Sequence, residues 1–435
     1  MLKLCLLQFR IVGDLPPEAW KRVHRYASWM RRIRVDHLDV LGEEAVRQFR
    51  LNSPSDGWFP ALRSLAWTTS ARNLLYIDLL FSPYLEEVWI STPPSWGRSR
   101  FPRDILPALT STISTLPTSA LKTLQLGPVL GTDTRDTHWV HFKDLFSSVV
   151  LRCGPSLMHL ASPVPLSDIA VDHVIRLPHL RTWGIEGPPP NYSVSSPLPD
   201  FPTLTGFTLG EYAARGWLSL FKRLEDRVSV TQGTTPLYRV KESLKSLSVD
   251  VPSTTPIIDI SLTSPIQMFR NLVTLDVVVG CGQGQCAFKL NNDDVTNLAL
   301  ALFQLERLHL GFPCQENTCT TTVACLLPIS VYCVKLEILE IHFNTTNIVD
   351  DLKNIPADPK FQELRSLPRG ALWHLGVHGM PLILDESDFE TVVDGMVDIF
   401  PSLTRCAGYG DTWVKLTKEI EALPRMRTLL VRCRW

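Results

Sequence analysis

The strongest constraint on the fold is a six-residue pattern, apolar-x-x-apolar-x-apolar, that recurs thirteen times in this 435-residue chain. The spacing between successive hexamers varies from 23 to 40 residues. Repeats of this length are typical of solenoids and related arrays. The hexamers begin at Leu62, Leu85, Leu121, Leu157, Leu180, Leu204, Leu244, Leu272, Leu305, Leu336, Leu372, Leu403 and Met426.

A proline at a fixed position before the hexamer supports the repeat in seven of the thirteen cases. It lies two residues before the hexamer and often follows a large apolar residue. Proline ends a preceding helix and favours an extended segment after it, so each repeat is predicted to run helix, apolar anchor, proline, strand. The seven are Pro60, Pro83, Pro155, Pro178, Pro202, Pro401 and Pro424.

A repeat this small cannot bury its own apolar face, but stacking on its neighbours creates a continuous core. We therefore predict an α/β leucine-rich-repeat solenoid, with a curved parallel sheet on the concave side and helices on the convex side. Many repeats exceed the usual 20–29 residues and lack the usual asparagine, so inserted loops are expected. A globular α/β protein is the alternative, although it does not explain the repeated proline phase.

Two regions are expected, a helical N-terminal cap over 1–50 and the repeats over 51–435. Residues 18–34 suit an amphipathic helix with Trp20, Val23, Ala27 and Met30 on one face.

Composition narrows the classes of function. The 43 basic and 44 acidic residues give a net charge of −1, without the basic excess typical of nucleic-acid binding. The apolar start is interrupted by Lys3 and Gln8, and no stretch approaches the roughly 20 apolar residues that span a membrane. We expect a cytoplasmic or nuclear protein whose ten cysteines are mostly reduced.

Several segments resemble F-box leucine-rich-repeat proteins of basidiomycete fungi. They are Trp20–Arg22, Tyr26–Arg34, Phe59–Trp67 and Phe81–Val88, and the repeat rhythm extends the resemblance along nearly the whole chain. The resemblance implies a substrate receptor of a cullin-type ubiquitin ligase, whose F-box docks on a Skp-type adaptor. The repeats would hold a protein target for proteasomal degradation.

The chain departs from that family at the N-terminus. Leu15–Glu18 resembles the opening of an F-box, but the pattern does not continue. We therefore expect weak or no adaptor capture by this chain, and the alternative is a repeat scaffold with no ubiquitin-ligase link. No catalytic motif occurs, so neither an enzyme nor a cofactor is expected.

The predicted concave face supplies the candidate partner contacts. Residues inside the strands that are not part of the apolar pattern should point to this face. His309 and Glu340 share one repeat phase, so they are expected about 5 Å apart, and His342 and His378 share another. The four histidines and the carboxylate could ligate a metal or sense pH, but polar contacts to a protein partner are the favoured interpretation. The candidates are Trp89, Arg307, His309, Glu340, His342, His374 and His378.

Four cysteines form a second candidate site. Cys281 and Cys314 share one phase in adjacent repeats, and Cys286 and Cys319 share another. Stacking could bring the four thiols together around zinc, but unligated loop thiols are the default expectation, and no metal is predicted.

Four further features have structural interpretations. Cys406 occupies a core strand position, and Cys333 aligns with the apolar anchor. The Gly280–Gly284 segment is expected to be a loop, and His138–His141 a surface feature.

Overall fold

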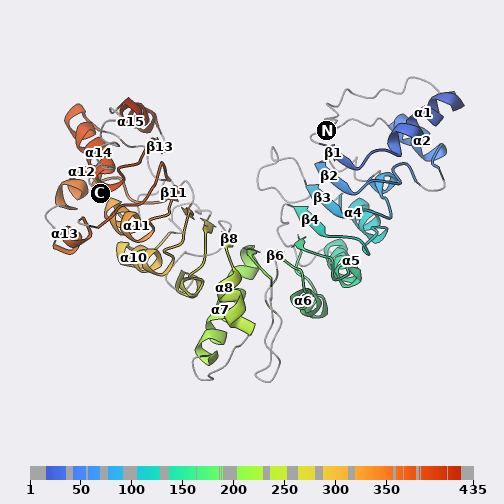
Figure 1. Cartoon of the computed structure of the whole chain (residues 1–435), viewed down its shortest axis with the longest axis horizontal. Helices are drawn as coiled ribbons and strands as arrows, with labels where there is room; N and C mark the ends of the chain where they lie inside the picture. The colour runs from blue at the N-terminus through green and yellow to red at the C-terminus, as the bar shows by residue number, and fades with distance from the viewer. Residues whose placement is uncertain are drawn as a thin grey trace. The chain divides into compact units, whose positions relative to one another are not determined.

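The computed structural model forms two compact units, Met1–Leu204 and Thr205–Trp435 (Figure 1). It describes residues 16–35, 43–54, 57–68, 77–91, 105–127, 137–162, 164–185, 187, 189, 203–228, 236–251, 263–279, 288–311, 319–355, 359–365, 367–378, 382, 384–408 and 410–422.

In the first unit, the described strands run parallel and pair in sequence order. They are β1 (Arg32–Val35), β2 (Ser64–Thr68), β3 (Glu87–Ser91), β4 (Thr123–Gly127), β5 (His159–Ala161) and β6 (Thr182–Ile185). Helices α4, α5 and α6 lie along one face of this sheet (Figure 1). The described helices are α1 (Pro17–Ala27), α2 (Glu43–Leu51), η1 (Ile77–Leu80), α4 (Ile105–Ser114), α5 (Thr137–Arg152) and α6 (Asp168–Ile175).

The second unit repeats this arrangement. Its described strands are also parallel and sequential: β7 (Gly206–Leu209), β8 (Ser246–Val251), β9 (Thr274–Val279), β10 (Arg307–Leu310), β11 (Ile338–Ile341), β12 (His374–Val377) and β13 (Arg405–Ala407). The described helices are α7 (Glu211–Val228), α8 (Pro236–Ser243), η3 (Ser264–Met268), α10 (Asn292–Ala301), η4 (Val323–Cys325), α11 (Leu326–Tyr332), α12 (Ile348–Asn354), α13 (Pro359–Arg365), α14 (Glu386–Ile399) and α15 (Asp411–Ala422). None of the helices in the described ranges is long and apolar enough to cross a membrane.

The sequence hexamers coincide with the strands. In each of β2 to β13, the strand begins at the third residue of a hexamer. The strand register aligns the same hexamer position in neighbouring repeats, as in Leu65 with Val88 and Leu308 with Leu339. The hexamer at Met426 lies outside the described residues.

A tight turn precedes the strands and explains the prolines. Leu62 donates its backbone N–H to the Phe59 carbonyl at 3.0 Å, and Leu403 donates to Phe400 at the same distance. The proline is therefore the second residue of a four-residue turn, where its fixed φ is favourable. Cys333 accepts the corresponding bond from Leu336, which confirms that this cysteine occupies the anchor position.

The core lies between each sheet and its helices. The first, fourth and sixth hexamer positions point into it, and Leu62, Leu124 and Leu308 are at most 2% exposed. Burying one leucine contributes about 1.5–3 kcal/mol, so the repeated hexamer leucines contribute substantially to stability. Cys406 of β13 is buried in the same layer, as predicted.

The predicted helix over 18–34 is only half correct. α1 ends at Ala27, and Arg32–Val35 forms strand β1, which pairs with β2. Met30, Ile33 and Val35 match the apolar hexamer, and the Arg31 carbonyl accepts bonds from the backbone of Arg63 and Ser64. The same two bonds recur at the start of the next repeats, so the repeat begins inside the predicted cap.

Candidate functional site

The helix-free face of each sheet carries the side chains that the core does not use. These come from the third and fifth hexamer positions, because successive strand residues point to opposite faces. In the second unit the fifth positions form one row across the strands, because the strand register pairs each of them with the next. The row is Thr208, Ser248, Asp276, His309, Glu340, Gly376 and Ala407.

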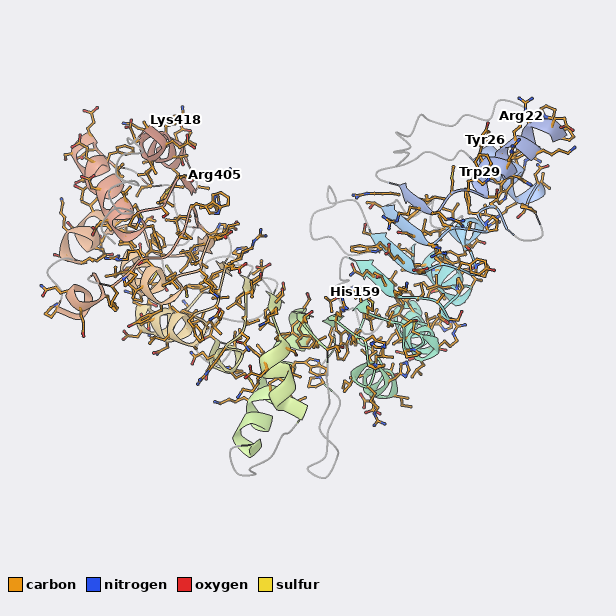
Figure 2. The ribbon with its side chains drawn as sticks, in the orientation of Figure 1. Arg22, Tyr26, Trp29, His159, Arg405 and Lys418 are labelled. Carbon is orange, nitrogen blue, oxygen red and sulfur yellow. The ribbon has the colours of Figure 1, made fainter. Side chains whose placement is uncertain are left out.

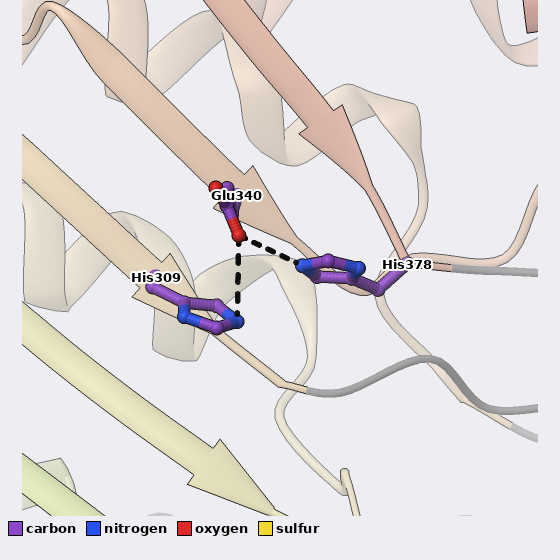
Figure 3. A group of neighbouring side chains, drawn as sticks. All are labelled: His309, Glu340 and His378. Carbon is purple, nitrogen blue, oxygen red and sulfur yellow. Dashed lines mark hydrogen bonds and ion pairs between the residues drawn. The ribbon is translucent and has the colours of Figure 1, made fainter. Parts of the chain in front are cut away.

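Three side chains converge in the middle of this row. Oε2 of Glu340 lies 3.2 Å from Nε2 of His378 and 3.8 Å from Nε2 of His309 (Figure 3). The two imidazole rings are 5.1 Å apart between centroids. We call His309, Glu340 and His378 the imidazole–carboxylate cluster. The predicted neighbour relation of His309 and Glu340 is confirmed, because β10 and β11 pair them directly.

Asp276 extends the cluster on its β9 side. Its Oδ1 lies 2.9 Å from Nδ1 of His309. With Nδ1 beside Asp276, the Nε2 atom on the other side of the His309 ring faces Glu340. That Nε2 atom is buried and has no hydrogen-bond partner among the described residues.

A glycine makes room for the carboxylate. Gly376 pairs with Glu340 across β11 and β12, and a Cβ at Gly376 would lie 2.9 Å from Cγ of Glu340. Because Gly376 has no side chain, Glu340 leans over β12 and reaches His378 just beyond its end.

The cluster's histidines differ in their electrostatics. Burial opposes charge on His309, but the Asp276 and Glu340 carboxylates offset it and raise the pKa of this ring. Burial and the neighbouring His309 lower the pKa of His378, although Glu340 partly counters them. The Glu340 carboxylate therefore lies between a more basic imidazole, His309, and a less basic one, His378.

The other predicted partner contacts of the second unit differ in their exposure to solvent. Arg307 is exposed on β10, and His374 is partly exposed on β12. Burial, with help from Arg405, lowers the pKa of His374. His342 is a correction: only 2% is exposed and it packs against Phe288, so it is not available on the exposed face. Burial lowers the pKa of His342 to about 4.

In the first unit, Trp89 is prominent on the helix-free face. It is 47% exposed and pairs with Ala66 on one side and Gln125 on the other. A large apolar side chain exposed on a strand often marks a binding surface. Tryptophans in protein interfaces frequently contribute most of the binding energy.

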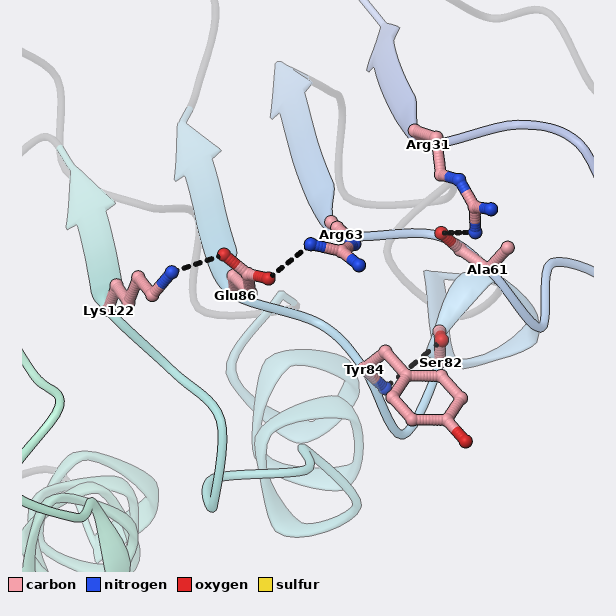
Figure 4. Close-up of polar contacts among 7 residues, drawn as sticks. All are labelled: Arg31, Ala61, Arg63, Ser82, Tyr84, Glu86 and Lys122. Atoms are coloured by element: carbon pink, nitrogen blue, oxygen red, sulfur yellow. Dashed lines mark hydrogen bonds and ion pairs between the residues drawn. The ribbon is translucent and has the colours of Figure 1, made fainter.

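Charged residues line the start of the same strands. Glu86 accepts from Arg63 at 3.1 Å and from Lys122 at 2.7 Å, which links three consecutive repeats (Figure 4). The hydrogen bond from Lys122, with smaller contributions from both cations, lowers the pKa of Glu86. Arg31 donates to the Ala61 carbonyl at 3.1 Å and extends the polar edge toward β1.

Helix α1 and the turn that follows it expose aromatic and basic side chains. Tyr26 is 60% and Trp29 is 62% exposed, and the Arg25 guanidinium lies 5.6 Å from the Trp29 ring centroid. Figure 2 shows Arg22 and Tyr26 on α1 and Trp29 just after the end of the helix. On the inner side, Trp20 is buried against Trp58 at 5.4 Å. α1 is therefore anchored on one side and open on the other.

Most of the four cysteines that could form a zinc site lie outside the described residues. Cys281, Cys286 and Cys314 lie there, as does the Gly280–Gly284 segment. Cys319 is buried. Of the His138–His141 segment, His141 is exposed on α5.

Sequence reasoning missed Asp276 and Gly376. Both share the hexamer phase of His309 and Glu340, so extending that phase by one strand in each direction would have found them.

The described residues thus define an α/β repeat protein with a polar helix-free sheet face in each unit. Comparisons with known family models and with characterised proteins found no match.

Proposed function

We propose that this chain is a leucine-rich-repeat recognition protein that binds a protein partner through the helix-free face of its sheets. Exposed Trp89 carries the proposal most directly. The strands position it rigidly, so little conformational entropy is lost when a partner covers it. The polar Arg307, His374 and imidazole–carboxylate cluster would provide partner contacts in the second unit.

The test begins with proximity labelling in the native cell to identify partners. Binding of a purified partner is then compared for the wild type and Trp89→Ala. We expect at least a tenfold loss, which corresponds to about 1.4 kcal/mol. Tyr84→Ala is the matched control, because Tyr84 is 65% exposed but lies in the turn before β3. Equal affinity of wild type and Trp89→Ala would remove Trp89 from the binding surface.

We also propose a narrower role as a substrate receptor of a cullin-type ubiquitin ligase. It is supported by the family resemblance and by exposed Tyr26 on α1 and exposed Trp29 just after it, which suit an adaptor contact. A scaffold without ligase recruitment is the alternative.

A pull-down with a Skp-type adaptor and a cullin separates these two roles. We expect capture by this chain to be weak and to disappear in Tyr26→Ala/Trp29→Ala. Capture that is unchanged in the double variant would contradict a role for α1. No capture by the wild type would favour the scaffold.

A further inference from the structure

We propose that His309, Glu340 and His378 form a binding site for a divalent transition-metal ion, with Zn²⁺ as the best match. The inference concerns the chemistry of the cluster and does not depend on the proposed recognition function.

The geometry is close to that of a metal site. One ligand atom from each of the three residues lies within 4.8 Å of the other two. Neighbouring ligands of tetrahedral zinc are roughly 3.3 Å apart, as follows from bond lengths of about 2.0–2.1 Å. The Glu340–His378 distance of 3.2 Å already fits, and the Glu340–His309 distance of 3.8 Å needs only a small closure.

The unused nitrogen of His309 is a second, independent indication. A buried polar atom without a partner is unfavourable, and Nε2 of His309 is such an atom among the described residues. It faces the carboxylate that would share the metal (Figure 3). A bound cation would satisfy it.

Asp276 supplies the support that metal-binding histidines commonly have. Its carboxylate lies 2.9 Å from Nδ1 of His309. A carboxylate at one imidazole nitrogen places the proton there and leaves the lone pair of the other nitrogen free for a metal. Asp276 is therefore a positioning residue.

The donor set determines which ion fits. Two imidazole nitrogens and one carboxylate oxygen suit zinc and related transition metals, whereas Ca²⁺ and Mg²⁺ prefer oxygen ligands. Three protein ligands leave a fourth position for water or for a side chain of a partner. The side chains are 19–36% exposed, so the site is open to solvent.

The test uses the full chain after treatment with a chelator. Zn²⁺ is titrated by calorimetry, and Co²⁺ is followed by visible absorption. We expect one equivalent to bind, with the d–d bands of a nitrogen- and oxygen-ligated Co²⁺. His378→Ala and Glu340→Gln should each weaken binding more than about tenfold, and Asp276→Asn by about tenfold.

His159→Ala is the matched control, because His159 lies on the helix-free face of β5 in the first unit, where it contacts Thr182 at 2.8 Å. Its zinc affinity should equal that of the wild type. Circular dichroism establishes that each variant is folded, and the isosteric Glu340→Gln remains informative if an alanine variant unfolds.

Three outcomes would overturn the proposal. The first is no zinc binding by the folded wild-type chain. The second is unchanged affinity in His378→Ala and Glu340→Gln. The third is thiolate-to-cobalt charge transfer in the near ultraviolet, which would place the metal on cysteines.

Discussion

At the scale of single residues, the space left by Gly376 determines where the Glu340 carboxylate lies. A Cβ there would approach Cγ of Glu340 to 2.9 Å. This neighbour is the flexible part of a side chain, so it can rotate away with little effect on the fold. The carboxylate would then lose its position beside His378.

Gly376→Ala should therefore weaken zinc binding by about tenfold while the free energy of unfolding changes by less than about 1 kcal/mol. Gly127→Ala is the control, because Gly127 ends β4 and a Cβ there would meet nothing within 4 Å. Calorimetry with Zn²⁺ and denaturant unfolding measure the two effects. Full zinc affinity in Gly376→Ala would contradict the steric argument.

Buried thiols give a second prediction at this scale. Burial raises the pKa of Cys153, Cys333 and Cys406 to about 12 in each case. Because the thiolate is the reactive form, almost none is present at pH 8.

Alkylation of the native protein with iodoacetamide at pH 8 should leave these three cysteines unmodified, whereas the unfolded protein reacts at all of them. Peptide mapping by mass spectrometry gives the readout. Rapid native labelling of Cys333 would show that the turn before β11 opens far more often than its buried position implies.

At the scale of elements, the sequence predicted the strands well because each combines a two-residue alternation with a fixed turn. The Phe59–Leu62 turn and the buried Leu65 are both readable from residue types. Strand β1 was missed because its apolar residues, Ile33 and Val35, alternate with Arg32 and Arg34 and follow a helical pattern. The position of the His309 Nε2 atom was not predictable, since it depends on ring orientation.

The ion pairs of Glu86 connect elements from three repeats and yield a pH-dependent prediction. Folding lowers the pKa of Glu86, chiefly through Lys122, so its contribution is present at neutral pH. It is lost as the pH falls through the folded-state pKa. Because Arg63 is 61% and Lys122 is 49% exposed, solvent screening limits the effect to less than about 1 kcal/mol.

Glu86→Gln should lower the free energy of unfolding by up to about 1 kcal/mol at pH 7, and the difference should be smaller at pH 3. Urea unfolding at both pH values measures it. Glu18→Gln, which removes an exposed pair within α1, is the control and should change stability little. A deficit of Glu86→Gln that persists at pH 3 would show that the ion pairs are not its cause.

At the scale of the whole molecule, the sequence predicted a repeat array but not its division into two units. The boundary between Leu204 and Thr205 lies inside a hexamer, where the apolar pattern is unchanged. The division into compact units depends on how many contacts between distant residues cross the boundary. The hexamer pattern is local in the sequence and carries no information on those contacts. The repeated pairing nevertheless has a consequence for stability. In a repeat array each strand contacts mainly its neighbours, so a defect should spread only a short distance.

Leu308→Ala tests this in the second unit. Leu308 is 2% exposed in β10, and truncation of a buried leucine costs about 2–5 kcal/mol. Hydrogen exchange followed by mass spectrometry should show the largest loss of protection in β9, β10 and β11, which pair directly, and little change in β3 to β5. Leu124→Ala in β4, where Leu124 is fully buried, should give the converse pattern. A single compact core would instead lose protection everywhere in both variants, because its strands open together. That uniform loss would contradict nearest-neighbour stability, and with it the repeat-array basis of the proposed recognition face.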